Sequence, residues 1–254
     1  MQILLTNDDG IHAPGLRAMR DALAGMGDVH LVAPYIEQSG VALAITYLHP
    51  LMVHEEFRDG ERFGWAVQGS PADCVKLGVL EFCPKKPDLV VSGINAGANV
   101  GVNVHYSGTV AGAIEGAFFG VTSIAVSLDL AETPDYSAAA RHARTLVERI
   151  LALRPPAGSL WNVNLPASTP EGPRGVKTAA LGVKRHVDVM EKRIDPRGRP
   201  YYWSGQTPID DHQAEPGTDV RELAEGHATI TPLQLDYTDR PALKEISEID
   251  WRLD

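Results

Sequence analysis

The sequence predicts a three-layer α/β/α, Rossmann-like fold built on a mostly parallel sheet. Over roughly the first 170 residues, short apolar runs alternate with amphipathic segments, which is typical of βαβ units. Polar, glycine-containing segments follow several of these runs, where open α/β folds bind their ligands. Beyond residue 170 the alternation stops and prolines interrupt the chain. Its 254 residues fit one large domain with an appendage.

The elements of the first part follow from periodicity and from start and stop signals. Strands are expected where apolar residues run together between turn signals, and helices where apolar residues recur every three or four positions. Ser70-Pro71 supplies an N-cap followed by proline at the first helical position. The expected strands are 2–6, 29–33, 89–91, 122–128 and 161–165, and the expected helices are 14–26, one after Ser70, 109–119 and 136–153.

The later part of the chain predicts a hairpin arm. Residues 183–194 and 199–204 are expected to pair, because Asp195-Pro196-Arg197-Gly198 between them is a favourable turn sequence. An aromatic cluster, Tyr201-Tyr202-Trp203, is expected near the base of this arm. Such an arm favours an oligomer contact over an independent module.

The remaining segments complete the domain prediction. Residues 205–226 are expected to form a linker, and residues 228–231 a strand that returns to the core. We therefore predict an α/β catalytic core over residues 1–170 and a C-terminal oligomerisation region over residues 171–254.

Composition and charge exclude several classes of function. The formal net charge is −10, and no basic run is present, so long nucleic acid is not an expected partner. No apolar stretch approaches the ~20 residues of a membrane span. The two cysteines, Cys74 and Cys83, have no metal-binding or redox spacing, which favours a cytoplasmic protein. A small anionic substrate is compatible with this acidic chain only if a cation or backbone amides offset the charge.

Two adjacent aspartates follow the first expected strand directly. Asp8 and Asp9 precede Gly10 and place concentrated negative charge at the carboxyl edge of the sheet. Because adjacent carboxylates repel each other, both stay ionised only with water or a cation nearby. Taken alone, the pair is compatible with a metal site or with a solvated turn.

Further polar residues are expected at the same edge. Ser39 follows the second strand, and Asn95 follows the strand at 89–91. With Asp8 and Asp9 they offer oxygen ligands only, which suit Mg²⁺ or Mn²⁺ and disfavour structural zinc. The alternative for Ser39 and Asn95, each taken singly, is a turn or cap residue.

An anion site is expected beside this metal site. Ser107, Gly108 and Thr109 stand at a helix start, where hydroxyls, backbone N–H groups and the helix dipole favour phosphate. An ordinary N-cap is the alternative. His12 and His105 lie near these segments in sequence, as general-base candidates or as surface residues.

With these segments in view, the chain resembles the SurE family of metal-dependent nucleotidases. The resemblance covers nearly the whole chain and is most specific around the aspartates and around Asn95. The matching motifs are Leu4-Leu5-Thr6-Asn7-Asp8-Asp9-Gly10-Ile11, Ala33-Pro34 with Gln38-Ser39, Gly69-Ser70-Pro71-Ala72-Asp73, Asp88-Leu89-Val90-Val91-Ser92-Gly93-Ile94-Asn95-Ala96-Gly97, Tyr106-Ser107-Gly108-Thr109-Val110, Asn162-Val163-Asn164-Leu165-Pro166, Gly217-Thr218-Asp219 and Ile230-Thr231-Pro232-Leu233.

The resemblance implies a 5′/3′-nucleotidase that hydrolyses nucleoside monophosphates and, in some members, short polyphosphate. The metal ligands of the family map onto Asp8, Asp9, Ser39 and Asn95. The resemblance also implies a homodimer or homotetramer in which the arm and the tail are exchanged between subunits. Some members carry a catalytic aspartate and histidine in the tail. Here Asp236 matches the aspartate, but Arg240 stands at the place of the histidine, so that role is not carried over.

The expected reaction is phosphomonoester hydrolysis, with Asp8 and Asp9 as catalytic residues and metal ligands. Ser107, Gly108 and Thr109 are expected to hold the phosphate. Either Asp8 or a metal-polarised water can attack phosphorus. An aspartyl-phosphate phosphatase usually needs an Asp-x-Asp spacing, which adjacent Asp8-Asp9 does not supply. The alternative from another class is a non-catalytic nucleotide-binding module, which favours glycines over carboxylates in the first turn.

Overall fold

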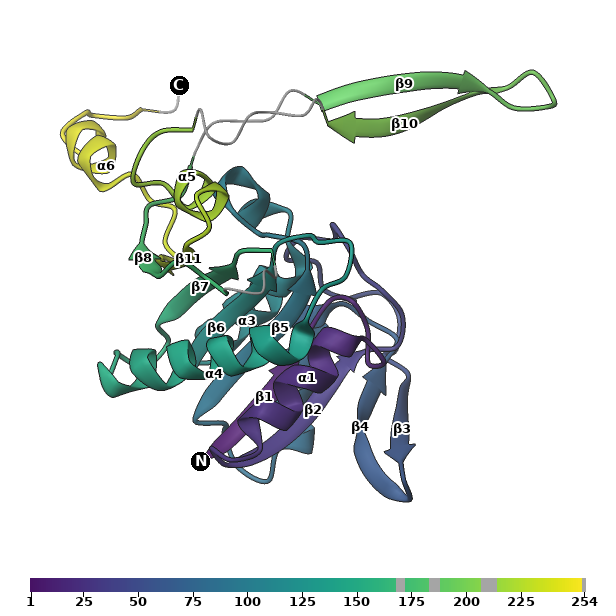
Figure 1. Ribbon diagram of the computed structural model, residues 1–254. Helices are drawn as coiled ribbons and strands as arrows, with labels where there is room; N and C mark the ends of the chain where they lie inside the picture. The colour runs from purple at the N-terminus through teal and green to yellow at the C-terminus, as the bar shows by residue number, and fades with distance from the viewer. Residues whose placement is uncertain (168–171, 183–187, 207–213, 253–254) are drawn as a thin grey trace.

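The computed structural model describes residues 1–167, 172–182, 188–206 and 214–252, and centres on one large sheet covered by helices on both faces (Figure 1). The predicted α/β class is therefore confirmed. The strands of the sheet are β1 (Gln2–Thr6), β2 (Asp28–Pro34), β3 (Val53–Arg58), β4 (Glu61–Val67), β5 (Leu89–Ala96), β6 (Thr122–Leu128), β7 (Leu160–Leu165), β8 (Val176–Thr178) and β11 (Ala228–Leu233). Their order across the sheet is β3-β4-β2-β1-β5-β6-β7-β11-β8.

The central strands of this sheet all run in one direction. β1 pairs in parallel with β2 and β5, and the parallel pairing continues through β6 to β7. Only β3, which pairs with β4, and β11, which pairs with β7, join their neighbours in antiparallel fashion among the described strands of the sheet. The loops that follow β1, β2 and β5 therefore leave the sheet at the same edge.

Helices cover the two faces of the sheet in pairs. α1 and α4 contact each other over one face, and α2 and α3 contact each other over the opposite face (Figure 1). The helices and helical turns are α1 (Pro14–Leu23), α2 (Pro71–Leu77), η1 (Gly78–Phe82), η2 (Gly101–His105), α3 (Gly108–Phe118), α4 (Tyr136–Ala152), α5 (Asp219–Ala224) and α6 (Arg240–Ile246). No helix in the described residues is both long enough and apolar enough to cross a membrane.

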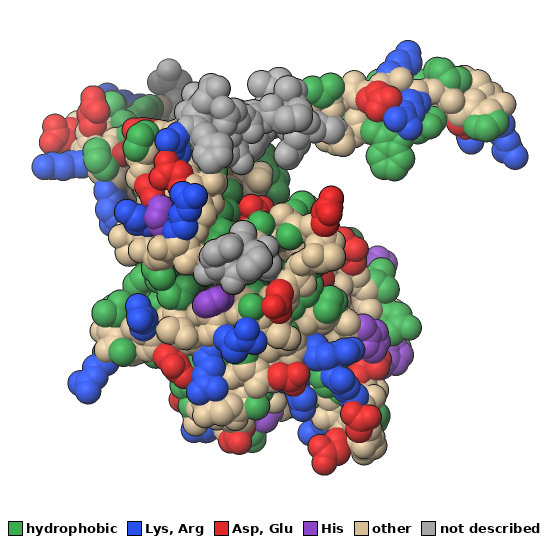
Figure 2. All heavy atoms as spheres, viewed as in Figure 1, with side chains coloured by type: hydrophobic (Ala, Val, Ile, Leu, Met, Phe, Trp, Pro, Cys, Tyr) green, Lys and Arg blue, Asp and Glu red, His purple; other side chains and the backbone are tan. Residues whose placement is uncertain are grey.

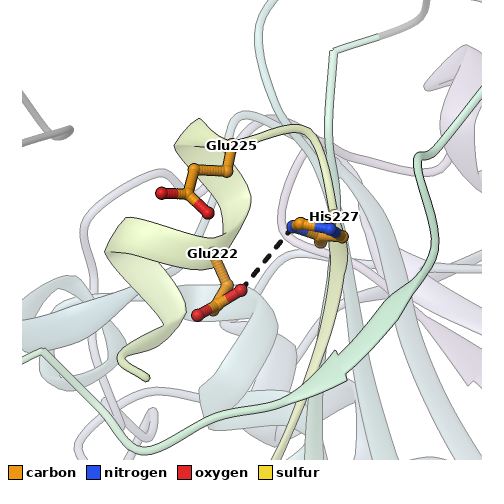
Figure 3. A group of neighbouring side chains, drawn as sticks. All are labelled: Glu222, Glu225 and His227. Carbon is orange, nitrogen blue, oxygen red and sulfur yellow. Dashed lines mark ion pairs between the residues drawn. The ribbon is translucent and has the colours of Figure 1, made fainter. Parts of the chain in front are cut away.

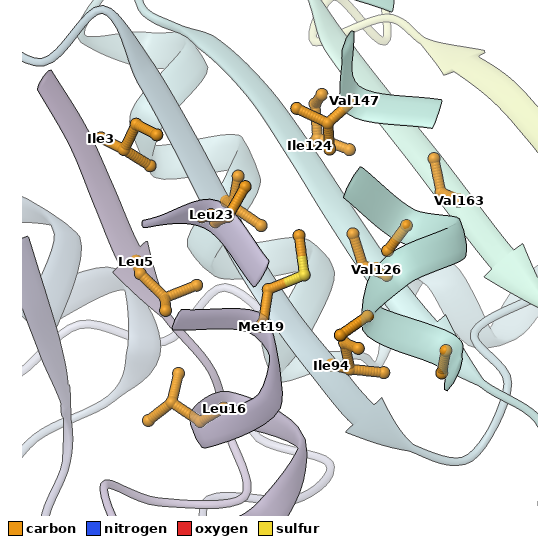
Figure 4. Packing of buried hydrophobic residues seen from close by; sticks show 14 of the residues in the cluster. Ile3, Leu5, Leu16, Met19, Leu23, Ile94, Ile124, Val126, Val147 and Val163 are labelled. Carbon is orange, nitrogen blue, oxygen red and sulfur yellow. The ribbon is translucent and has the colours of Figure 1, made fainter. Parts of the chain in front are cut away.

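The apolar strands alternate between the two helical layers. In β1, Ile3 and Leu5 pack in the cluster under α1 and α4, whereas Leu4 packs in the cluster under α2. This follows from the two-residue period of a strand. Figure 4 shows Leu16, Met19 and Leu23 of α1 over the first of these clusters, as their three- and four-residue spacing predicts.

α3 lies unusually close to the sheet because its inner face carries glycines. A Cβ at Gly112 would lie 2.9 Å from Ser92 Oγ, and one at Gly116 would lie 2.5 Å from Ser123 Oγ. Real Cβ atoms do not approach other atoms so closely, so a larger side chain would move α3 outward. The close packing fixes the start of α3 relative to the end of β1.

Two differences from the predicted elements have clear reasons. α1 ends at Leu23, three residues earlier than expected, and glycine follows at positions 25 and 27. β3 and β4 were not expected, because β3 (VHEEFR) is an exposed edge strand that carries charged residues instead of an apolar run. The cap at Ser70 is present as predicted, and Asp73 completes it as a capping box.

The C-terminal part supplies both an arm and two strands of the main sheet. β9 (Asp188–Ile194) and β10 (Pro200–Gln206) pair in antiparallel fashion and project from the body of the molecule (Figure 1). The predicted strand residues 183–187 lie outside the described residues. Tyr201 and Tyr202 lie in the half of the arm next to the turn, and Trp203 pairs with Glu191 at its middle, so the expected position near the base was wrong, because β10 continues to Gln206. Inside the predicted linker 205–226, the structure places α5.

Candidate metal and phosphate site

Four segments of the chain meet around Asp8 and Asp9. The Gln38 N–H, in the loop after β2, donates to the Asp8 carbonyl oxygen at 2.7 Å. The Ala96 N–H, at the end of β5, donates to Asp9 Oδ2 at 3.1 Å. The start of α3 packs against the Asp8 side chain from a third direction. The parallel sheet thus gathers the segments at one edge, as the sequence predicts for three of them.

Asp8 is enclosed by the first turn of α3. Its carboxylate accepts a short hydrogen bond from the Thr109 hydroxyl, and the residue is only 4% exposed. Gly108 makes room for this contact, since a Cβ there would lie 2.8 Å from Asp8 Cβ and 2.9 Å from Asp8 Oδ2. The positive end of the α3 dipole therefore faces the Asp8 carboxylate.

The surroundings of Asp8 and Asp9 disfavour the charged forms of both carboxylates. Burial raises the pKa of Asp8 to about 6, the Thr109 hydrogen bond opposes the rise, and the charge of Asp9 adds to it. Burial also raises the pKa of Asp9, with a smaller contribution from Glu37. Within the described part of the chain, neither carboxylate has an ion pair with lysine or arginine. Two partly desolvated carboxylates without a protein cation fit a divalent metal ion.

Asn95 lies at this edge, next to the last residue of β5. Its Nδ2 donates to the Gly97 carbonyl oxygen at 2.7 Å, which occupies the amide nitrogen and leaves Oδ1 as the ligand atom. Gly97 has φ +123°, a conformation that L side chains rarely adopt, so glycine is required for this turn. Asn95 and Asp9 are linked through Ala96, whose N–H bonds Asp9.

Ser39 lies in the loop after β2, where its hydroxyl has a partner. Ser39 Oγ donates to Glu37 Oε1 at 2.6 Å, and the residue is exposed. Its neighbour Gln38 is the residue that contacts Asp8 through the backbone. The structure thus places Ser39 in the loop at this edge, with its hydroxyl proton donated to Glu37. Because Ser39 Oγ is the donor in this bond, its oxygen lone pairs remain available to a metal ion.

The three predicted phosphate-binding residues divide into different roles. Ser107 Oγ accepts from the Val110 N–H at 3.1 Å and is the N-cap of α3. The Thr109 hydroxyl is committed to Asp8. The backbone N–H groups of the first turn, beginning at Gly108, remain the natural donors to an anion, because such groups have no partner inside a helix.

The histidines and the tail aspartate lie outside this cluster of contacts. His12 is 3.7 Å from Glu56 and exposed, and His105 has a ring contact with Tyr237. Asp236 pairs with Arg240, the residue at the place of the family histidine. None of these interactions orients a base toward Asp8.

A buried asparagine network beside the site was not predicted as functional. The Asn99 N–H donates to Asn164 Oδ1 at 2.8 Å, and Asn162 Nδ2 donates to the Asn99 carbonyl oxygen at 2.8 Å. Asn99 Nδ2 completes the network by donating to Ser127 Oγ at 2.8 Å. The signal in the sequence is Asn-Val-Asn within a buried strand, which puts two amides on one face of β7.

A second group of potential metal ligands lies on the C-terminal part. Glu222 of α5, its C-cap residue Glu225, and His227 hold ligand atoms within 4.8 Å of one another (Figure 3). Glu225 accepts from Arg221 Nε at 2.6 Å, and Glu222 lies 3.6 Å from His227 Nδ1. Both glutamates already have basic partners within the protein, so we interpret the three residues as a cluster of ion pairs.

Comparisons with known proteins identify similar sequences and structures. The family model described as Survival protein SurE matches residues 3–188. A relative named 5′-nucleotidase SurE from Rhodopirellula baltica is 51% identical over 254 residues, which is 100% of this chain and 99% of the relative. Another of that name, from Desulforudis audaxviator, is 43% identical over 258 residues and covers 99% of each chain. The crystal structure of the SurE protein from Aquifex aeolicus has a TM-score of 0.84 at 38% identity, covering 97% of this chain and 98% of that one.

Proposed function

The chain belongs to the SurE family, and from this membership we propose that it is a divalent-metal-dependent 5′-nucleotidase that acts at the edge of the sheet around Asp8 and Asp9. The reaction is hydrolysis of nucleoside 5′- and 3′-monophosphates to nucleoside and phosphate. Its single strongest structural support is the Asp8 carboxylate, buried against the first turn of α3 at the end of β1. Short polyphosphate is a further substrate within this proposal.

The proposed metal ligands are Asp8, Asp9, Asn95 and Ser39. They provide carboxylate, amide and hydroxyl oxygens, which suit Mg²⁺ or Mn²⁺. The raised pKa values of Asp8 and Asp9 support this assignment, because they show that the protein alone does not neutralise the pair. When bound, a divalent cation supplies Lewis-acid polarisation of the phosphate.

The start of α3 is the proposed phosphate-binding element, through Ser107, Gly108 and Thr109. The backbone N–H groups of the first turn donate to phosphate oxygens, and the helix dipole stabilises their charge. Ser107 keeps this turn in place as the N-cap, and Thr109 orients Asp8 by donating its hydroxyl to Oδ1. Glycine at position 108 lets the anion and Asp8 share one turn of backbone.

Asp8 and Asp9 are the proposed catalytic residues. Asp8 is placed either to attack phosphorus itself or to orient an attacking water, and the Thr109 hydrogen bond limits its rotation in both routes. The stereochemical course at a chiral phosphorus separates them, because two successive displacements through an Asp8 phosphate retain its configuration, whereas a single attack by water inverts it.

The proposal extends to assembly and location. The arm, which projects from the body of the molecule (Figure 1), supports a homodimer or homotetramer. Its aromatic residues are exposed in the single chain. The free thiols Cys74 and Cys83 support a cytoplasmic location.

Phosphate release from a panel of nucleoside monophosphates, with and without EDTA, tests the function. We expect metal-dependent release by the wild-type protein and release at background for Asp8→Asn. Asp21→Asn, which removes the same charge from an exposed position on α1, is the matched control and keeps full activity.

Thermal unfolding supplies a second reading of the same variants. Mn²⁺ stabilises the wild-type protein and Asp21→Asn through binding to the folded state, but stabilises Asp8→Asn much less. Full activity of Asp8→Asn would contradict the assignment of Asp8 as a catalytic residue. Nucleotide binding that is unaffected by EDTA and is not followed by phosphate release would instead favour a non-catalytic module.

A further inference from the structure

A buried carboxylate from the C-terminal part reaches the loop that leads into the phosphate site. Asp219 is the first residue of α5 and is 0% exposed. Its Oδ2 accepts from the Gly101 N–H at 2.9 Å, and its Oδ1 accepts from the Gly182 N–H at 2.8 Å. One side chain therefore joins backbone segments separated by 118 and 37 positions from it in sequence.

The backbone geometry at this contact requires glycine at position 101. Gly101 has φ +56°, and a Cβ there would lie 2.4 Å from the Gly182 carbonyl oxygen. The two segments can approach because Gly101 lacks a side chain, while glycine at position 182 makes room for Val220, where a Cβ would lie 2.8 Å from Val220 Cγ2. The carboxylate also accepts from the Val220 N–H at 2.9 Å, so it satisfies three backbone donors, and its loss would leave the N–H groups of Gly101 and Gly182 buried without this partner.

The held segment continues directly into α3. Gly101 begins η2, and the Asn103 carbonyl oxygen accepts from the N–H groups of Tyr106 at 3.0 Å and Ser107 at 3.1 Å. Ser107 is the N-cap of α3. A hydrogen-bonded turn thus connects the backbone at Gly101 with the first turn of α3.

The other end of the loop is anchored independently. Asn99 is bonded to Asn162 and Asn164 of β7 and to Ser127 of β6. The loop between Asn95 and α3 therefore has two attachments, one to the sheet and one to Asp219. The second joins the C-terminal part to the first residue of η2, and the ring contact between His105 and Tyr237 is a further contact of that part with η2.

We propose that Asp219 is a positioning residue for the phosphate-binding end of the site, holding Gly101, and through η2 the first turn of α3, in the geometry that phosphate requires. The inference rests on the proposed function, because the phosphate role of α3 belongs to it. Through Asp219, the C-terminal part therefore influences phosphate binding and turnover.

Asp219→Asn is the most direct test, because it keeps the size of the side chain. Its single amide oxygen can accept from the N–H group of Gly101 or of Gly182, while its NH₂ group faces the other. We expect kcat/KM for nucleoside monophosphate to fall ~10- to 100-fold, as for a small misplacement of binding groups. Inhibition by inorganic phosphate weakens in parallel. The Mn²⁺ dissociation constant changes less than the phosphate inhibition constant, since Asp9 and Asn95 are held by backbone contacts at the end of β5.

Hydrogen exchange measures the positioning of this segment independently of enzyme activity. Amides over residues 101–109 should exchange faster in Asp219→Asn, with no change over residues 3–7 of β1. Thr218→Ala is the matched control, because Thr218 caps the same helix but does not contact Gly101. Loss of the cap lowers thermal stability, but this variant keeps the wild-type kcat/KM and exchange pattern.

The outcomes separate the two proposals. Wild-type exchange and wild-type kcat/KM in Asp219→Asn would overturn the inference, as would an equal loss in Thr218→Ala. Absence of phosphate release by the wild-type protein would overturn the proposed function, while exchange over residues 101–109 and binding of inorganic phosphate would still decide the role of Asp219. If Asp219→Asn does not fold, Asp219→Ser, which leaves no buried charge, is measured in the same way with the same expectation.

Discussion

The electrostatics of Asp8 and Asp9 determine which ligands this edge of the sheet accepts. Asp8 is almost fully buried, and burial is the largest cause of its raised pKa. The dipole of α3 and the Thr109 hydroxyl stabilise its charge, but the neighbouring Asp9 opposes it. A bare anionic substrate would meet this repulsion. A divalent cation removes it and lets carboxylate and phosphate oxygens occupy the same small region.

At the residue scale, Gly108→Ala tests the contact between α3 and Asp8. Alanine is otherwise favourable in a helix, but its Cβ would lie 2.8 Å from Asp8 Cβ. We expect the helix start or Asp8 to move, with a ~10- to 100-fold loss of kcat/KM. The free energy of unfolding, measured in urea, should fall by about 1–3 kcal/mol, as in other overpacked positions.

Gly25→Ala is the control for this variant. Gly25 follows α1, and the atom nearest to its Cβ position is the end of the flexible Arg144 side chain, at 3.0 Å. That side chain can move at little cost, so activity should remain at the wild-type level. Wild-type kcat/KM in Gly108→Ala would show that the close packing on Asp8 is not needed for turnover.

The sequence located the candidate site better than it described individual side chains. Asp8, Asp9 and Asn95 were placed together because parallel strands deliver their loops to one edge, and the structure has that arrangement. The hydroxyl of Ser39 bonds Glu37, and that of Ser107 caps α3. Such choices depend on local rotamers and on competing acceptors, which a residue pattern does not contain.

At the scale of elements, the start of α2 connects helix capping to the loop that follows β2. Ser70 Oγ accepts from the Asp73 N–H at 3.1 Å and donates to the Ala44 carbonyl oxygen at 2.6 Å. The Asp73 carboxylate accepts from the backbone and hydroxyl of Thr46 as well as from the Ser70 N–H. The capping box therefore also holds residues 44–46, which belong to the loop that reaches Asp8 through Gln38.

Ser70→Ala should lower the free energy of unfolding by about 1–2 kcal/mol, because a buried cap is lost and the Ala44 carbonyl loses its donor. Urea denaturation measures the change. Asp239→Ala removes a cap of the same kind from α6, which buries none of its residues. It should cost less than about 0.5 kcal/mol. Equal losses in the two variants would mean that the contact with Ala44 contributes nothing.

The elements differ in how well their sequences predicted them. β6 was predicted with its observed bounds, and α3 within one residue at each end, because each is bounded by clear turn or cap signals. The sequence did not predict β3, β8 or α5, which are short, exposed or charged. Their stability comes from neighbours distant in sequence, and no local pattern records those neighbours.

At the scale of the whole molecule, the C-terminal part is both a continuation of the sheet and a projection from it. β11 pairs with β7, and β8 pairs with β11, so the chain returns to the core after residue 170. Asp219 lies in the same returning part. The division into a core of residues 1–170 and a region of residues 171–254 stays a prediction, but the sheet itself spans both.

The single chain does not account for the apolar side chains that the arm exposes. A two-stranded hairpin is marginally stable in water, yet β9 and β10 carry exposed apolar side chains on both faces: Trp203 lies opposite Glu191 on one face, and Tyr202 lies beside Met190 on the other. Figure 2 shows hydrophobic side chains along the arm, well away from the body of the molecule. Apolar surface of this kind is expected to be covered by a partner.

We therefore predict that the arm associates with a second copy of the chain. In the double variant Tyr202→Lys/Trp203→Lys, each face of the arm receives a charge that resists burial, so the assembly should dissociate toward the mass of one chain. Light scattering after size-exclusion chromatography measures the mass. Leu153→Lys changes an equally exposed apolar residue at the end of α4, outside the arm, and should leave the mass unchanged. A wild-type protein with the mass of one chain, or a double variant with the wild-type mass, would contradict the prediction. Because the proposed site lies in the core, any loss of phosphate release in the double variant would further show that assembly supports the loops around Asp8.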